Sequence, residues 1–111
     1  MSIFITQGRY TREAIKGMIM KPEDRAEALS RHVARAGGRV LSYYLTFGEY
    51  DFLTVIEAPG ETQMAAILLA AAGSGGVSDL RTTLAMTSVE AKGAFAAAGD
   101  LAPGYRAPGG T

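Results

Sequence analysis

The stretch SYYLTFGEYDFLTVIEAPG, residues 42–60, places Tyr44, Asp51 and Glu57 inside an apolar and aromatic run. Enclosure raises the pKa of a carboxyl group, so an enclosed Glu57 would suit general base chemistry. A tyrosine hydroxyl such as that of Tyr44 can orient a ligand. Together with the oppositely charged Arg81, these residues are the ligand-binding candidates, and Glu57 and Tyr44 are also the catalytic candidates.

Each candidate also has a purely structural interpretation. Asp51 lies beside a turn, where Asp carboxylates habitually accept backbone N–H bonds, so such a bond or an ion pair with Arg81 is the favoured role. A solvated strand end is favoured for Glu57, and half-buried tyrosines like Tyr44 are common in sheets without a ligand. Asp51 and Glu57 lie roughly 20 Å apart along one strand face, too far for a catalytic carboxylate pair within one chain.

Other kinds of site find little support in the sequence. The chain has no Cys and one histidine, His32, so the usual ligand sets for a transition metal are absent. We interpret His32 as a surface side chain. No Ser lies in a hydrolase nucleophile signature, and the glycine-rich segment 73–76 lacks the Lys of a phosphate-binding loop. We therefore expect no cofactor and no metal.

Length and charge indicate one neutral domain. A chain of 111 residues is long enough to bury one core but not two. Its 11 basic and 11 acidic side chains balance, which argues against nucleic acid or an anionic membrane as the main partner. MSIFITQGRY is too short and polar for a signal peptide, and no apolar run reaches spanning length. We expect a soluble, cytoplasmic protein.

The periodicity of apolar residues predicts an alternation of strands and helices. Strands are predicted at 2–9, 39–47, 50–57 and 77–86, and helical segments at 11–18, 21–38, 61–73 and 88–98. This β-α-β-β-α-β order is typical of the α+β ferredoxin-like fold, in which both helices cover one face of a four-stranded antiparallel sheet. Residues 1–98 then form the domain, and the Gly/Pro-rich residues 99–111 form a flexible tail.

Helix ends and buried stripes refine this prediction. Pro22 suits the first position of the helix at 21–38, and Gly37 and Gly38 suit its end. Thr87 and Glu90 have the spacing of a capping box at the start of the last helix. Two apolar stripes are predicted to face the sheet, one made of Ala26, Leu29, Val33 and Ala36 and the other of Met64, Ile67, Leu68 and Ala71.

The register of the central hairpin decides which residues share a face. Only Gly48 and Glu49 separate its predicted strands, which favours a type II′ turn. Three pairs then lie on the helix side of the sheet, namely Leu45 with Phe52, Tyr43 with Thr54, and Leu41 with Ile56. The opposite face carries Val40, Ser42, Tyr44, Thr46, Asp51, Leu53, Val55 and Glu57, and alternation adds Arg81 to it.

This second face is half apolar, which is a liability for so small a domain unless another surface covers it. The simplest cover is a second copy of the chain, and we expect a homodimer that encloses a cavity lined by Tyr44, Asp51, Glu57 and Arg81. The alternative is a monomer whose open face is hydrated. Tyr105 and Arg106 of the tail are candidate lid residues for the cavity.

Gly48, Tyr50 and Asp51 in FGEYDFLTVIEAPG form the Gly-x-Tyr-Asp pattern of the GYD-domain family, which this sequence resembles over most of residues 2–95. The segment TREAIKG departs from the family, which often has a Gly-containing turn there. The resemblance implies membership of the dimeric α/β-barrel proteins, and hence dimerisation through the sheets, with higher oligomers as an option. Relatives in that group include cofactor-independent monooxygenases, isomerases, effector-binding domains and haem enzymes, some of which hold haem through one axial His.

Three functions follow as hypotheses. The first is a binding module that holds a small, partly apolar metabolite in a cleft on the sheet, with Tyr44, Glu57 and Arg81 as polar anchors. The second is a cofactor-independent enzyme, of isomerase or monooxygenase type, that uses an enclosed Glu or Tyr for proton transfer. The third is an assembly partner without a ligand. The absence of a recognisable catalytic constellation favours binding.

Overall fold

The computed structural model describes residues 1–110, and its elements form one sheet with two of the helices packed on one side. Their order is β1 (Ser2–Tyr10), α1 (Arg12–Met20), α2 (Arg25–Arg35), β2 (Arg39–Leu45), β3 (Phe52–Ala58), α3 (Glu61–Gly73), β4 (Val77–Ala85), α4 (Ser88–Leu101) and the 3-10 helix η1 (Ala102–Gly104). The strands are antiparallel in the order β2-β3-β1-β4. The ferredoxin-like fold predicted from the sequence is confirmed.

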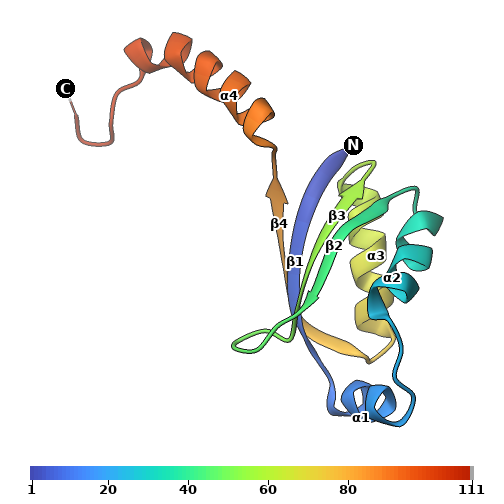
Figure 1. Cartoon of the computed structure of the whole chain (residues 1–111). Helices are drawn as coiled ribbons and strands as arrows, with labels where there is room; N and C mark the ends of the chain where they lie inside the picture. Colours follow the sequence, from blue (N-terminus) through green and yellow to red (C-terminus); the bar gives the residue numbers. More distant parts are fainter. Residues whose placement is uncertain (111) are drawn as a thin grey trace.

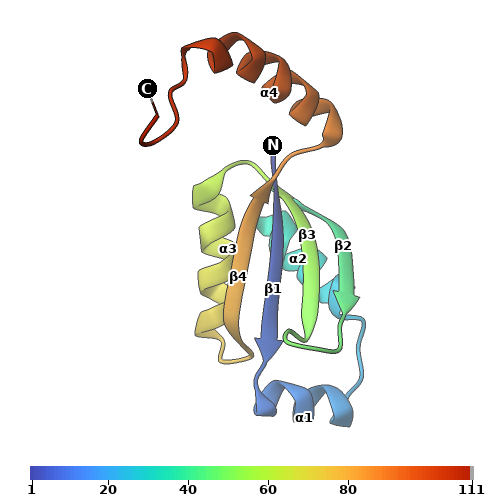
Figure 2. The ribbon, with the colours of Figure 1, turned by 90° about the vertical axis from the view of Figure 1, so that its left-hand side faces the viewer.

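The two faces of the sheet differ in what covers them. Helices α2 and α3 pack on one face, which we call the helix side (Figure 1). Within residues 1–110, no helix lies over the opposite, open face (Figure 2). Along β1 and β3, buried residues alternate with half-buried ones, as two central strands between a helix layer and an open face require.

The core lies between the sheet and these two helices. Its buried cluster consists of Phe4, Val33, Ile56, Ala58, Met64 and Ile67. The predicted stripes of α2 and α3 supply Val33, Met64 and Ile67, so their orientation is confirmed. Gly38 allows the end of α2 to approach β3 closely, because a Cβ at this position would lie 2.6 Å from the carbonyl oxygen of Glu57.

The start of α2 differs from the prediction. The helix begins at Arg25, and Pro22 lies in the segment before it. Asp24 is the N-cap, because its carboxylate accepts the N–H groups of Ala26 and Glu27. This capping fixes Arg25 in the first turn, at the entrance to the cleft described below. The predicted end is confirmed, since Gly37 has a positive φ of 80° just after the helix.

The central hairpin also differs in its turn and in one register position. Leu45 pairs with Phe52 and Tyr43 with Thr54 as predicted, but Val40 and not Leu41 lies opposite Ile56. Leu41 is the extra residue of an irregularity between Val40 and Ser42, which turns Val40 towards the core and leaves Leu41 exposed. The two-residue turn is wrong, because β2 ends at Leu45, β3 begins at Phe52 and residues 46–51 form a longer loop.

Two helices lie at opposite ends of the sheet (Figure 2). The segment TREAIKG, predicted as a helical turn, begins the nine-residue helix α1, whose N-cap is Thr11. Helix α4 starts at the predicted capping box of Thr87 and Glu90, which is confirmed, and it extends to Leu101. Among the described residues, its substantial packing contact is with η1 alone.

Candidate functional site

The predicted polar residues of the open face are spread over the sheet. Tyr44 is 61% exposed and lies opposite Leu53. Glu57 accepts a hydrogen bond from Arg39 at 3.3 Å on the neighbouring edge strand. Arg81, on β4, is opposite Gln7, whereas Glu57 is opposite Ile3. Four residues along β1 correspond to roughly 13 Å, so one chain does not bring Glu57 and Arg81 together.

Asp51 has a structural role in the loop that carries the Gly-x-Tyr-Asp pattern. Its carboxylate accepts the backbone N–H of Tyr10 at 2.9 Å, and its own N–H donates to the carbonyl of Gly8 at 2.8 Å. Arg9 adds a second connection, because its Nε donates to the carbonyl of Glu49 and its guanidinium lies over the ring of Tyr50. These contacts fix the loop to the end of β1, where Tyr10 begins the polar cluster described next.

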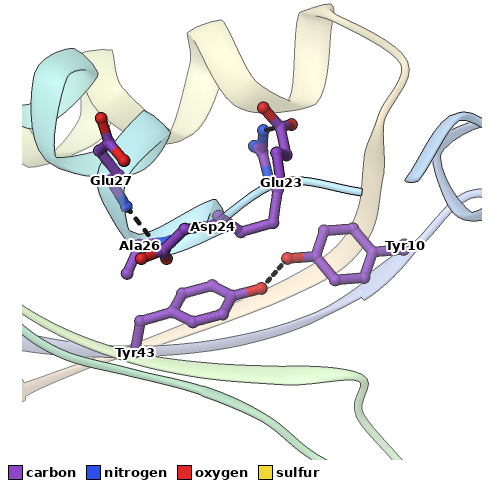
Figure 3. Close-up of polar contacts among 7 residues, drawn as sticks. Tyr10, Glu23, Asp24, Ala26, Glu27 and Tyr43 are labelled. Carbon is purple, nitrogen blue, oxygen red and sulfur yellow. Dashed lines mark hydrogen bonds and ion pairs between the residues drawn. The ribbon is translucent and has the colours of Figure 1, made fainter. Parts of the chain in front are cut away.

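A polar cluster that the sequence did not predict lies on the helix side. Tyr10, at the end of β1, and Tyr43, on β2, point their hydroxyl groups at each other and form a hydrogen bond beneath the segment that holds Glu23 and Asp24 (Figure 3). The ring of Phe52 contacts both tyrosines, with centroid distances of 5.0 Å to Tyr10 and 6.5 Å to Tyr43. The two phenols are therefore held in place by a buried aromatic neighbour.

Arg25 brings a positive charge to this tyrosine pair. Partial burial opposes the charged form, but the hydrogen bond from Arg25 to Glu23 at 2.7 Å and the nearby Tyr10 together raise the pKa of Arg25. Burial, followed by the hydrogen bond with Tyr10, raises the pKa of Tyr43 well above its usual range. At neutral pH the site therefore presents a charged guanidinium beside a protonated Tyr43.

Two adjoining cavities meet at this cluster. The outer one has a volume of about 440 Å³ and is bounded by α1, α2, α3 and the start of β4, with Lys21, Glu23, Arg25 and His32 among its polar lining. The inner one, of about 80 Å³, runs between the sheet and the helices and is lined largely by apolar residues such as Phe52, Met64 and Leu68. Both are lined by Tyr10, Arg25, Leu29, Ala71 and Val77, and we call them together the helix-side cleft.

His32 lies on the wall of the outer cavity and not on open surface. Its side chain is partly buried, and its Nε2 lies 3.3 Å from the carbonyl oxygen of Ile67, which identifies Nε2–H as the donor. Among residues 1–110, no three His, Cys, Asp or Glu side chains gather in a way that would hold a metal ion. Nor does any helix in that range have the length and apolar character needed to cross a membrane.

Part of this cleft was within reach of sequence reasoning. Alternation along β1 and β2 places Tyr10 and Tyr43 on the helix side, and the structure confirms the predicted pairing of Tyr43 with Thr54 on that side. No local sequence pattern predicts that Arg25 lines the cleft or that α1 forms one of its walls. The open-face candidates Tyr44, Asp51, Glu57 and Arg81 line neither of the two cavities.

One solved structure supports this fold, and a family model identifies the family. The crystal structure of TTHA0845 from Thermus thermophilus matches with a TM-score of 0.50 and 19% identity, over 78% of this chain and 95% of that chain. The crystal structure of FFRP-DM1 matches with a TM-score of 0.48 and 16% identity, over 78% of this chain and 100% of that chain. No curated protein sequence matches significantly. The family model described as GYD domain matches residues 4–95, and the chain therefore belongs to the GYD-domain family.

Proposed function

We propose that this protein binds a small, partly apolar metabolite in the helix-side cleft, with the polar end of the ligand at Tyr10, Tyr43 and Arg25. The observation that carries the proposal is that an outer cavity with charged side chains in its lining and a largely apolar inner cavity meet at Tyr10 and Arg25, where Tyr10 is hydrogen-bonded to Tyr43. The outer volume of about 440 Å³ lies in the range of small-molecule sites.

The hydrogen-bonding capacity of the cluster indicates which group the ligand presents. The two phenols have two donors between them, and their mutual bond uses one, so the other is available. Arg25 donates to Glu23 and has further N–H groups to offer. A surplus of donors beside a positive charge favours a carboxylate or a carbonyl oxygen at this point. The apolar remainder of such a ligand would extend towards Phe52 and Met64.

Two measurements test this proposal. Native mass spectrometry of freshly purified protein, followed by denaturation of the same sample, should release an additional small-molecule mass. Thermal unfolding should then be followed with matched probes, benzoate against benzyl alcohol and hexanoate against hexanol. At a hundredfold excess over Kd, a binding probe adds about 2.7 kcal/mol of stability.

The variants Tyr43→Phe and Tyr44→Phe locate the site. Both remove one hydroxyl group from neighbouring residues of β2, but Tyr43 lies on the helix side of the sheet and Tyr44 on the open face. We expect the acids to stabilise the original chain and Tyr44→Phe more than the alcohols do, and Tyr43→Phe to lose most of this difference. Loss of the difference in Tyr44→Phe alone would move the ligand to the open face. Absence of any copurified mass and of any probe effect would favour an assembly partner without a ligand.

A second candidate function is catalysis without a bound cofactor. The observation that favours it is the hydrogen-bonded pair of Tyr43 and Tyr10 next to the Arg25 charge, since a phenol that keeps its proton can donate a hydrogen bond to the oxygen of an enolate and stabilise its negative charge. If the released molecule is converted when it is added back, Tyr43→Phe should lower kcat much more than it weakens binding. A parallel loss of both would identify a binding role only.

We also propose that the chain forms a homodimer through the open face. Ile3, Ile5, Leu53 and Val55 occupy this face on the two central strands, and their partial exposure in a single chain supports a protein surface as the cover. Sedimentation velocity should show a dimer that Leu53→Lys and Val55→Lys convert to monomers. A monomeric original chain would contradict the proposal. The expected cytoplasmic location stays a prediction.

A further inference from the structure

Helix α4 has no substantial partner within the described part of its own chain except the short η1. Val89, Phe95 and Leu101 are 80%, 78% and 73% exposed. The radius of gyration is 18.0 Å, against about 13 Å for a compact domain of this length. The difference reflects α4, which extends away from the sheet on the side of the open face (Figure 1).

The sequence of α4 is unsuited to exposure on any side. At 3.6 residues per turn, Val89, Phe95 and Leu101 lie about 120° apart around the helix axis. Between them the helix carries only Glu90, Lys92 and Asp100 as charged residues, and most of the remainder are alanines. Helices that are apolar all round are found where protein surrounds them, whereas a helix on a single surface has one apolar stripe.

The helix also lacks the properties that would keep it formed in water alone. Isolated helices of this length are marginal even when rich in alanine. Gly93 and Gly99 weaken it further, and a Cβ at either position would meet no atom within 4 Å, so no contact within the chain accounts for these glycines. We therefore expect the helix at residues 88–101 to be stabilised by packing against a surface outside its own chain.

We infer that α4 is an exchange arm that packs against a second copy of this chain placed opposite the open face. This inference adds to the proposed homodimer a contact that the sheets do not provide. Face-to-face sheets lie about 10 Å apart, and a helix of 14 residues is about 21 Å long, so α4 reaches past the partner's sheet.

The second copy is favoured by geometry and by area. The loop 46–51 projects on the same side of the sheet as α4 (Figure 1), and its Phe47 is 95% exposed. Exposed apolar side chains therefore extend from both ends of the open face, from the loop at one end and from α4 at the other. Half of the lateral surface of a helix 21 Å long and about 10 Å across is roughly 330 Å². Two arms, each burying an equal area of the partner, give roughly 1,300 Å², which reaches the size of a stable interface without counting the sheets.

The first test weakens the arm without touching the fold. The variant Val89→Gln, Phe95→Gln and Leu101→Gln replaces three exposed side chains outside the core cluster with a residue of good helix propensity. The matched control makes the same change at Ile19, Met20 and Leu69, which are exposed on α1 and α3. In sedimentation equilibrium we expect the arm variant to raise the dimer Kd by about 100-fold or more, and the control to leave it unchanged.

The second test detects the arm on its partner directly. The chain has no cysteine, so Phe95→Cys accepts a single nitroxide label. Mixed with ¹⁵N-labelled unmodified chains, it should broaden amide signals of the ¹⁵N copy, which can arise only across the interface. A dimer whose Kd is unchanged in the arm variant, with no broadening between chains, would overturn the inference and leave the sheet-face dimer standing. A monomeric unmodified chain would overturn both.

Discussion

Removing the hydroxyl of Tyr43 is the most direct probe of the cluster at the centre of the cleft. In Tyr43→Phe the ring keeps its stacked position beside Phe52, and only the hydrogen bond with Tyr10 is lost. A bond between two neutral groups contributes about 0.5–1.5 kcal/mol to the free energy of unfolding. Because Tyr10 then faces a cleft that water can enter, we expect a loss of about 1 kcal/mol at neutral pH.

The same variant has a distinct dependence on pH. Burial and the bond to Tyr10 raise the pKa of Tyr43 above its ordinary value of 10.0, so the folded state retains a proton that the unfolded state releases. This stabilisation is complete below pH 10 and declines as the pH rises from there towards the folded pKa. The slope is at most about 1.4 kcal/mol per pH unit, because one proton is involved, and solvent screening of a half-buried group narrows the pH range over which this slope applies.

Urea unfolding at several pH values between 7 and 11 measures both effects. Tyr44→Phe is the control, since it removes an exposed hydroxyl from the neighbouring position and should change stability by less than about 0.5 kcal/mol. The stability difference between the original chain and Tyr43→Phe should be constant below pH 10 and shrink above it. Equal behaviour of the two variants across this range would refute the description of Tyr43 as a buried, hydrogen-bonded phenol.

Three further substitutions test the scaffold around the cleft. Met64→Ala, in the buried cluster, should cost about 2–5 kcal/mol in urea unfolding, whereas Leu69→Ala on the exposed side of α3 should cost far less. Asp51→Ala removes the acceptor for the N–H of Tyr10, so we expect a loss of about 1–2 kcal/mol, and full stability would contradict the structural role of Asp51. Gly8→Ala places a Cβ 2.7 Å from Phe52 and Leu80, and overpacking should cost about 1–3 kcal/mol and weaken the binding of any carboxylate probe.

The sequence was sufficient for the fold because the signals involved are local. Alternation in β1 and β3, the stripe of α2 and the capping box at Thr87 each depend on residues a few positions apart. Once these elements are in order, the rules for crossover connections leave few arrangements of the sheet. Tyr43 was placed on its correct face for the same reason.

The cleft could not be predicted from the sequence, because the residues that form it are distant along the chain. Tyr10 and Tyr43 are 33 positions apart, and their contact depends on β3 lying between β1 and β2 with Phe52 at the matching height. The irregularity at Leu41 also has no local mark, since the same residues would fit a regular ladder. A single extra residue there decides that Val40 and not Leu41 reaches the core.

The loop that carries the family pattern, residues 46–51, binds the end of β1 through hydrogen bonds to backbone groups. Asp51 holds the N–H of Tyr10 and the carbonyl of Gly8, and the carbonyl of Glu49 accepts from Arg9, so the loop sets the height and direction of the last residues of β1. Side chains that line the cleft from α1, α2 and α3 make none of these bonds. In this chain the Gly-x-Tyr-Asp pattern therefore serves the geometry of the sheet end, and the part of the cleft lining that α1, α2 and α3 supply is built independently of it.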